Sequence, residues 1–304
     1  MSVRDATHAG SWYSSNKQDL DRQLTGWLTA VGAATSDGDP VPINGLRAII
    51  APHAGYSYSG PAAGYAYKCI QPEFFKRVFI LGPSHHVYLS GCAISKCPKY
   101  STPLGDLIID HEVVNKALEK TGQFGYMSQE TDEDEHSIEM HLPYVYKVFE
   151  HHMDKVQIVP ILVGALTETT ERQYGKLLAP YLDDPQNLFI VSSDFCHWGQ
   201  RFDYTYYVDN KGVVSDSIRT LDREGMDKIE QQNHANFCKY LKKTRNTICG
   251  RHPIGVLMAA LEADATNNGN KYRTRFVHYA QSSGARNASD SSVSYASAFV
   301  QQAQ

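Results

Sequence analysis

Four largely continuous apolar runs constrain the fold of this chain most strongly. They lie at residues 46–50, 78–81, 156–163 and 188–191. Strands that are covered on both faces have this pattern, whereas strands with one solvated face alternate apolar and polar residues. Amphipathic stretches of helical period lie between or after the runs, at residues 112–121, 142–151, 169–182 and 215–231. The alternation predicts a layered α/β sandwich whose central sheet is mixed or mainly parallel and flanked by helices.

The two ends of the chain extend this architecture. Residues 16–31 place leucines and a tryptophan on one helical face, and Asn16 is available as the N-cap. The Gly-, Ser- and Pro-rich segment 32–45 is expected to connect this helix to the first strand. The C-terminal segments alternate more strongly and are expected to add edge strands, at residues 272–277 and 292–300.

Composition bounds the class of protein. The chain has 304 residues, which we expect to form one domain, 1–304, and its net charge of -4 offers no basic field for nucleic acid. It has no N-terminal apolar signal and no run of 18 apolar residues, so we expect neither secretion nor a membrane span. Six scattered cysteines are typical of free thiols in a reducing compartment. We expect a cytoplasmic protein, with the nucleus as a second location.

Residues that carry chemistry follow three of the four apolar runs. His53 follows the first run, His85 and His86 follow the second, and Asp194 and His197 follow the last. Ligands gather at the carboxyl ends of strands in open α/β sheets, so these side chains are expected at one edge. A lone strand-end histidine is commonly just a hydrogen-bonded loop residue. Three such strand ends favour a metal or catalytic cluster.

Cys249 has a distinctive setting. It precedes an expected helix with Pro253 near its first position, and Arg251 lies beside it. The helix dipole and the guanidinium are expected to favour the thiolate, the form that binds metal or attacks a substrate. The alternative is a small buried thiol, which is common for cysteine. The residues themselves leave both open.

The acidic run 132–135 is followed by His136 and His141. These histidines are five residues apart and diverge on a helix, so they do not form a zincin motif. The run is most simply a solvated surface or a helix N-terminal charge cluster, although Glu139 or His141 could lie beside the site. The chain has no dinucleotide fingerprint, Walker loop or nucleophile elbow, so nucleotide-dependent chemistry is not expected.

Six motifs together resemble the Memo family, whose name stands for mediator of ErbB-receptor-driven cell motility. They are HAGSWY at 8–13, APHAGY at 51–56, LGPSHH at 81–86, TDEDEHSIEMHLPY at 131–144, SSDFCHWG at 192–199 and NTICGRHP at 246–253. The resemblance spans nearly the whole chain and is highly specific, and the chain looks like an animal ortholog.

The resemblance implies a fold and a metal site. The fold is that of the class III extradiol (LigB-like) dioxygenases. The metal is copper(I) or iron(II), with zinc as a third fitting ion, held by residues matching His53, His85 and Cys249. Residues matching Asp194 and His197 lie in the same pocket, where they would tune the metal or move protons. Further residues expected around this pocket are Tyr56, His86, Glu139, His141 and Arg251.

The resemblance also implies a biological role. The family is tied to cell migration, receptor tyrosine kinase signalling and control of reactive oxygen species. The implied partners are phosphotyrosine-containing receptor peptides and cytoskeletal or redox regulators. The leading hypothesis is a metal-binding, redox-linked signalling protein, and whether it is a copper- or iron-dependent oxidoreductase stays open.

Two alternatives accompany that hypothesis. One is a non-enzymatic adaptor with a vestigial metal pocket that binds phosphopeptides, for which Arg201, Arg245 and Arg251 are candidate phosphate ligands. The other, placed last, is a ring-cleaving dioxygenase. Those enzymes use two histidines and a carboxylate, whereas a thiolate such as Cys249 moves the site toward softer metal chemistry.

Overall fold

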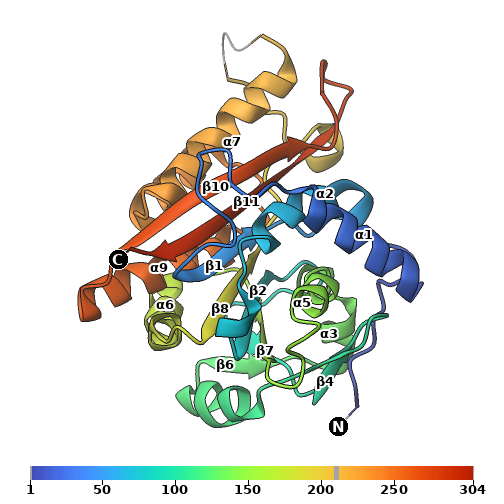
Figure 1. Cartoon of the computed structure of the whole chain (residues 1–304). Helices are drawn as coiled ribbons and strands as arrows, with labels where there is room; N and C mark the ends of the chain where they lie inside the picture. Colours follow the sequence, from blue (N-terminus) through green and yellow to red (C-terminus); the bar gives the residue numbers. More distant parts are fainter. Residues whose placement is uncertain (1, 209–211, 304) are drawn as a thin grey trace.

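A twisted mixed sheet forms the centre of the molecule (Figure 1). The computed structural model describes residues 2–208 and 212–303. Four parallel strands occupy the middle of the sheet and pair in the order β1, β8, β2, β7. Their bounds are Leu46–Ala51 for β1, Asn187–Ser192 for β8, Arg77–Pro83 for β2 and Gln157–Val163 for β7. These strands are the four apolar runs, so the predicted α/β class is confirmed.

Further strands extend the sheet on both sides, and the two that pair with β1 and β7 are antiparallel to them. On one side β11 (Ser292–Gln302) pairs with β1, and β10 (Tyr272–Gln281) forms the edge. On the other side β3 (Cys92–Ile94) pairs with β7 and β6 (Phe124–Tyr126) follows. The short strand β9 (His197–Trp198) pairs with β11, and a separate two-stranded sheet is made of β4 (Lys99–Ser101) and β5 (Asp106–Ile108).

The position of β11 corrects one expectation. Residues 292–300 were expected to form an edge strand, but β11 lies inside the sheet, between β10 and β1. Nearly all of β11 up to Val300 is buried, because many of its residues are small serines and alanines that pack under helices as well as facing the core. Such residues imitate the alternation of a half-solvated strand.

Most helices lie where periodicity places them. These are α1 (Lys17–Ala30), α5 (Leu142–Val148), α6 (Glu168–Asp183), α7 (Val214–Glu230) and α9 (Arg251–Asn268). The remaining α-helices are α2 (Tyr56–Tyr67), α3 (Gln129–Asp134), α4 (His136–Glu139) and α8 (His234–Thr244). Asn16 caps α1 by accepting a hydrogen bond from the backbone of Asp19 at 3.0 Å. Within the described part of the chain, no helix is long and apolar enough to cross a bilayer.

The expected α-helix at residues 112–121 has a different form. Glu112–Leu118 is wound as a π-helix and Glu119–Thr121 as a 3-10 turn, which ends at Gly122 with a φ of 69°. Apolar side chains gather on one face in either winding, so periodicity alone did not distinguish them.

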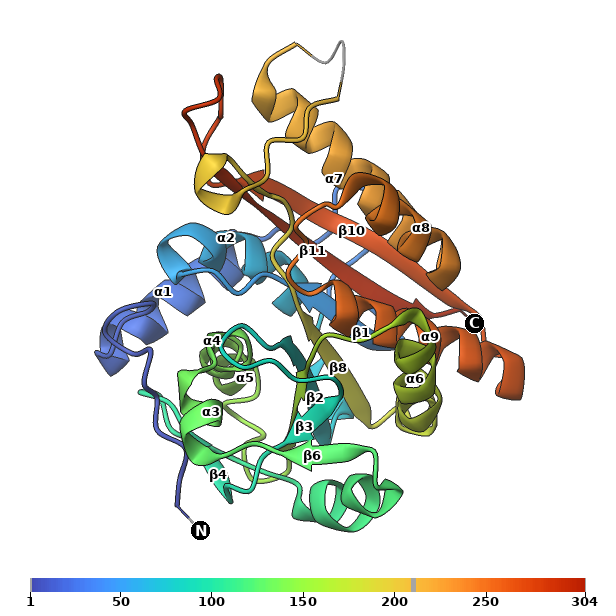
Figure 2. The ribbon, with the colours of Figure 1, turned by 180° about the vertical axis from the view of Figure 1, so that it is seen from behind.

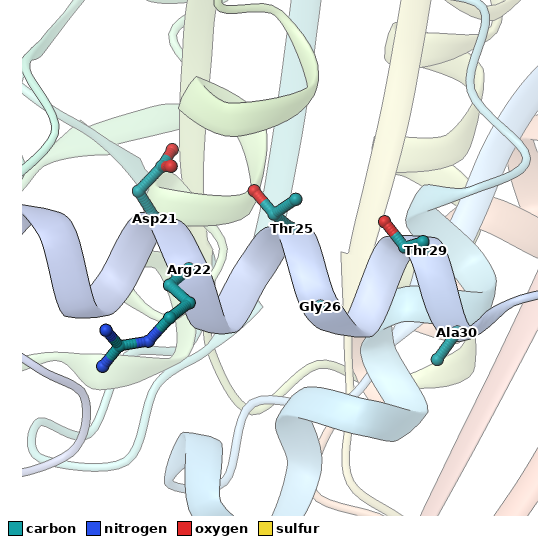
Figure 3. Close-up of a pocket in the computed structure, with 6 residues that line it drawn as sticks. All are labelled: Asp21, Arg22, Thr25, Gly26, Thr29 and Ala30. Carbon is teal, nitrogen blue, oxygen red and sulfur yellow. The ribbon is translucent and has the colours of Figure 1, made fainter.

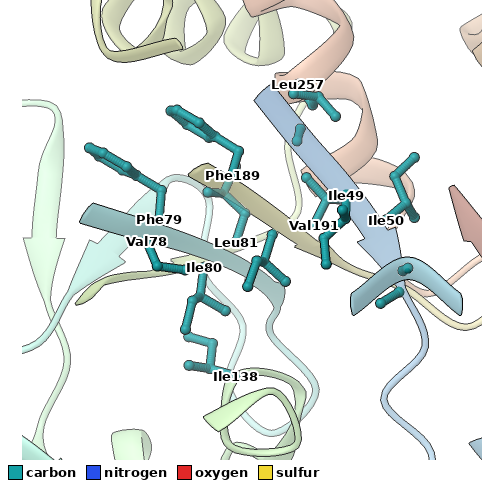
Figure 4. Packing of buried hydrophobic residues seen from close by; sticks show 14 of the residues in the cluster. Ile49, Ile50, Val78, Phe79, Ile80, Leu81, Ile138, Phe189, Val191 and Leu257 are labelled. Carbon is teal, nitrogen blue, oxygen red and sulfur yellow. The ribbon is translucent and has the colours of Figure 1, made fainter. Parts of the chain in front are cut away.

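Both faces of the central strands are buried. In Figure 4, Phe79 and Phe189 project to the side of Leu257 on α9, whereas Ile80 projects to the opposite side, toward Ile138 on α4. Successive strand residues point to opposite faces, so each central strand needs apolar residues at every position. Helices α6 and α9 cover one face (Figure 2), and α4 packs on the other. This double cover leaves the carboxyl ends of the strands as the place for polar groups.

Candidate metal centre

Three donor side chains meet at the carboxyl ends of the central strands. His53 follows β1, His85 follows β2, and Cys249 lies in the loop just before α9. One ligand atom from each of these residues lies within 4.8 Å of the other two. The Nε2 atom of His53 is 3.2 Å from the Sγ atom of Cys249. The trio named from the sequence as metal ligands is therefore brought together in space.

The hydrogen-bond network fixes the orientation of His53. Its Nδ1 lies 2.6 Å from Oγ of Ser192, and that hydroxyl donates its proton to the carbonyl of Ser137 at 2.7 Å. The Nδ1 atom must then carry the proton and donate it to Ser192, which leaves the Nε2 lone pair facing Cys249. Burial lowers the pKa of His53 well below its ordinary value. The ring is thus held neutral, in the form that binds metal.

Glu135 orients His85. The carboxylate accepts from the backbone N–H of His85 at 2.7 Å and from its Nδ1 at 2.8 Å. Burial alone would raise the pKa of Glu135, but the hydrogen bonds and charge of His85 lower it to about 2. An ionised carboxylate behind a histidine fixes the tautomer and makes the opposite nitrogen a better ligand. Glu135 therefore holds a candidate metal ligand, a position that the acidic run 132–135 did not reveal.

The setting of Cys249 differs from the expected one. The backbone N–H of Asp194 donates to Sγ at 3.2 Å, yet burial and the negative charge of Asp194 raise the pKa of the thiol. Arg251 is exposed, and its guanidinium contacts the carbonyl of Ile248 at 3.4 Å. The prediction of a thiolate favoured by Arg251 and the helix is wrong, because burial outweighs both. A bound cation would therefore displace the thiol proton.

Asp194 and His197 lie in the same pocket. The Oδ1 atom of Asp194 accepts from the backbone of His53 at 2.9 Å and of Ala54 at 3.3 Å, and burial raises the pKa of this carboxyl. The Nδ1 atom of His197 lies 2.9 Å from the carbonyl of Phe195, to which it must donate. Both side chains line a cavity of about 660 Å³ together with His53 and His85. Their catalytic role stays a prediction.

The cavity wall contains two aromatic residues whose role the sequence did not reveal. His136 stacks on His85 with ring centroids 4.4 Å apart, and Trp12 stacks on His136 at 4.3 Å. Burial and the neighbouring His85 lower the pKa of His136 to about 3, so this ring is neutral. Both residues belong to motifs quoted above. Their signal was present, but the spacing of residues along the chain did not show that they meet.

Several residues expected around the pocket do not line it. Tyr56 donates to the carbonyl of Met140 at 2.7 Å, and the Nδ1 atom of His141 lies 2.8 Å from the hydroxyl of Tyr67. His86 is exposed, and its ring meets His136 edge-on at 5.9 Å. Tyr56 and His141 therefore pack and hydrogen-bond inside the protein, and neither lines the cavity.

Glu139 is also outside the cavity. It is fully buried, and its carboxylate contacts Arg4 at 2.7 Å and the Nδ1 atom of His8 at 2.8 Å. It anchors the N-terminal segment. The same arginine contacts Asp132, which is 3% exposed. The interpretation of residues 132–135 as a solvated run is wrong for Asp132 and Glu135, because both carboxylates are buried against hydrogen-bond donors.

The three arginines considered for phosphate do not converge. Arg201 lines the cavity of the metal centre. Arg245 and Arg251 line a different cavity of about 830 Å³, bounded by α6, α8 and the start of α9. The two cavities share no lining residue among those that the structure describes. Of the three, Arg201 is the one placed to reach a group bound near the metal ligands.

A third hollow lies along α1 (Figure 3). Its wall comes from that single helix, and its two charged residues are paired elsewhere: Arg22 with Asp19 at 2.6 Å and Asp21 with Lys147 at 2.8 Å. It gathers no set of metal-binding side chains.

Comparison with known proteins agrees with the motifs. The family model described as "Memo-like protein" matches residues 4–299. The chain belongs to the Memo family. "Protein MEMO1" of Danio rerio is 57% identical over 296 residues, which cover 97% of this chain and 96% of the relative. "Protein MEMO1" of Homo sapiens is 54% identical over 293 residues, which cover 96% of this chain and 95% of the relative.

Two further proteins are similar to this chain at lower sequence identity. "Protein memo-1 homolog" of Caenorhabditis elegans is 49% identical and aligns with 97% of this chain and 81% of its own length. Among solved structures, "uncharacterized protein JW3007" from Escherichia coli K12 is similar with a TM-score of 0.51 at 10% identity, covering 82% of this chain and 98% of that one. At this identity the likeness shows a shared α/β fold.

Proposed function

We propose that this Memo protein binds one copper or iron ion through His53, His85 and Cys249 and uses it in redox-linked signalling. The observation that carries the proposal is the proximity of the three ligand atoms, all within 4.8 Å of one another. Cell migration, receptor tyrosine kinase signalling and control of reactive oxygen species are the proposed outputs. We place this role in the cytoplasm, where the six free cysteines would stay reduced.

The donor set fits such a metal. The Nδ1 atoms of both histidines are engaged, by Ser192 and Glu135, so the Nε2 atoms are the nitrogens left for a ligand role. Two imidazoles and one sulfur suit copper(I), iron(II) or zinc rather than magnesium or calcium. When bound, copper or iron would supply one-electron chemistry.

The surrounding residues position the metal ligands or provide groups that can exchange protons. Ser192 and Glu135 hold the two histidine rings in position. Asp194 provides a carboxyl beside the donors, and burial raises the pKa of this carboxyl. His197 directs Nδ1 to a carbonyl, so its Nε2 is the atom that can accept a proton from a group in the cavity.

Elemental analysis tests this proposal. Protein purified without added metal should contain about one copper or iron per chain, held by His53, His85 and Cys249. Cys249→Ser and His53→Ala should lose that metal, while Cys97→Ser, which removes a buried thiol outside the cluster, should retain it. Full copper or iron content in the first two variants would show that the ligand assignment is wrong.

A second candidate function is phosphopeptide binding, favoured by Arg201 in the wall of the same cavity. Its guanidinium lies 4.7 Å from the centre of the Phe202 ring, an arrangement that can present it to a phosphate. Binding of a phosphotyrosine peptide that persists after metal removal and in His85→Ala would support an adaptor. Loss in both would couple peptide binding to the metal centre.

Ring cleavage stays the last candidate. The test is to load the protein with iron(II) under anaerobic conditions and then to add catechol and oxygen. Absence of a ring-opened product would exclude it.

A further inference from the structure

A second group of metal-binding side chains lies away from the metal centre, where α6, α8 and α9 pack together (Figure 2). Glu168 and Glu171 come from the first turn of α6, and His234 and Cys238 come from α8. The spacing of four residues places the imidazole and the thiol on one face of α8. His252 completes the group from the start of α9.

The distances are close to those of a coordination shell. One ligand atom each from Glu168, His234 and Cys238 lies within 4.8 Å of the others. The Sγ atom of Cys238 is 3.7 Å from Nε2 of His234 and 3.9 Å from Oε2 of Glu171. Zinc bonds of ~2.0–2.3 Å in tetrahedral geometry place neighbouring ligand atoms roughly 3.3–3.8 Å apart. Small side-chain rotations would bring the atoms to a common centre.

Two histidines hold the carboxylate of Glu171 in position beside the thiol. Its two oxygens contact Nε2 of His234 and Nδ1 of His252, each at 2.6 Å. Burial alone would raise the pKa of Glu171, but these two hydrogen bonds lower it, so the carboxylate is ionised. For Nε2 of His234 to bind a cation, its proton must move to Nδ1, which is buried without a hydrogen-bond partner among the described residues, or leave the site. Oε2 of Glu171 is then released toward the same cation, while His252 keeps the other oxygen in place.

The electrostatic balance of the cluster favours a cation. Two carboxylates lie beside the thiol of Cys238, because Sγ is 3.9 Å from Oε2 of Glu171 and a ligand oxygen of Glu168 lies within 4.8 Å of it. A bound metal would take the place of the thiol proton. The surface cations nearest to Glu168 are Lys242 at 3.6 Å and Arg172 at 3.9 Å, and both side chains are substantially exposed. Such solvated pairs are weak and would yield to a buried divalent ion.

The cluster is also accessible. Glu168, Glu171, Cys238 and His252 line the cavity of about 830 Å³ that contains Arg245 and Arg251. An ion can therefore reach the thiol from solvent, and water can occupy any free coordination position. Imidazole, thiolate and carboxylate donors together select zinc over calcium or magnesium.

We propose that Glu168, His234 and Cys238 form a second metal site, with Glu171 as the fourth ligand, that binds zinc independently of the centre at His53, His85 and Cys249. The alternative is a hydrogen-bonded packing cluster in which Glu171 only joins α8 to α9.

Cobalt(II) and zinc(II) titrations of the full chain separate these readings. Cys249→Ser provides the background, because it removes the thiolate of the other centre. In that background we expect one zinc ion per chain and a near-ultraviolet cobalt–thiolate absorption band. Adding Cys238→Ser should abolish the band. Adding Glu168→Gln, which replaces a proposed ligand, should weaken zinc binding at least about tenfold, the smallest loss typical even for groups that only support a ligand.

Controls keep the outcome interpretable. Cys97→Ser in the same background should leave the band and the zinc affinity unchanged. The side chain of Glu168 is 37% exposed, so its replacement tests the site without disturbing the core. Folded Cys249→Ser protein without a cobalt–thiolate band, or with a band that survives Cys238→Ser, would overturn the proposal. Neither result depends on copper or iron at the first centre.

Discussion

Replacing Glu135 with glutamine tests how much the metal centre depends on the group behind His85. The two hydrogen bonds from His85 go to different oxygens of the carboxylate, the backbone N–H to Oε2 and Nδ1 to Oε1. A glutamine has one acceptor oxygen, so its NH₂ group must face one of these two donors. The nearby N–H of Ser137, which donates to Oε1 at 2.9 Å, favours keeping the oxygen there. Either orientation of the amide leaves one donor of His85 unpaired.

The expected loss is large enough to measure. Glu135→Gln removes the negative charge behind His85 and leaves one of its donors unpaired. Weakening such a supporting group typically costs about 10–100-fold in metal affinity, which corresponds to roughly 1.4–2.8 kcal/mol of binding free energy. The assay is anaerobic titration of metal-free protein with copper(I) against a chromophoric chelator. Asp134→Asn is the matched control, because the adjacent Asp134 is exposed. An affinity of Glu135→Gln equal to that of the control would refute the assigned role.

Three further predictions concern stability. Gly250→Ala should destabilise the fold by several kcal/mol in urea denaturation, because a Cβ there would lie 2.3 Å from the carbonyl oxygen of Ser192; unchanged stability would mean that the loop can move. Glu139→Gln should cost about 1.5–3 kcal/mol, because buried Arg4 keeps its contact with Asp132 but loses the charge of its 2.7 Å partner, and a loss below that of a surface variant would contradict this. Burial lowers the pKa of His141 from 6.5 to about 3. As the pH falls below 6.5, the unfolded chain therefore binds a proton at His141 that the folded chain does not bind. The free energy of unfolding falls with the pH until about pH 3, where the folded chain binds the proton too. Between pH 8 and pH 5 the loss should therefore be about 2 kcal/mol smaller in His141→Gln than in the parent, whereas equal losses would refute the assignment.

The central strands were predictable because the pattern that marks them lies within each short segment of sequence. Each of the strands β1, β2, β7 and β8 is buried on both faces, and continuous apolar runs record that burial directly. By contrast, α2 went unnoticed, since its sequence of glycine, serine, alanine, proline and tyrosine lacks an apolar stripe. The inner position of β11 depends on pairing with a strand some 250 residues earlier, a relation that local pattern does not contain.

The same distinction holds for the site. His53, His85 and Asp194 could be placed together because parallel strands bring their carboxyl ends to one edge. Cys249 needed the family resemblance as well as its position before a helix. The burial of Glu135 was not predictable, because an acidic run is normally solvated and its hydrogen-bond donor His85 lies 50 residues earlier in the chain. The second cluster escaped notice for a similar reason, since Glu168 and Cys238 meet only when α6 and α8 pack beside α9.

Anomalous scattering from metal-loaded crystals tests the central claim most directly. Data collected on both sides of the copper or iron absorption edge should show one peak at bonding distance, ~2.0–2.3 Å, from nitrogen atoms of His53 and His85 and from Sγ of Cys249. A crystal of folded, metal-loaded protein with no peak among these three residues, or with its copper or iron bound elsewhere, would contradict the proposed centre.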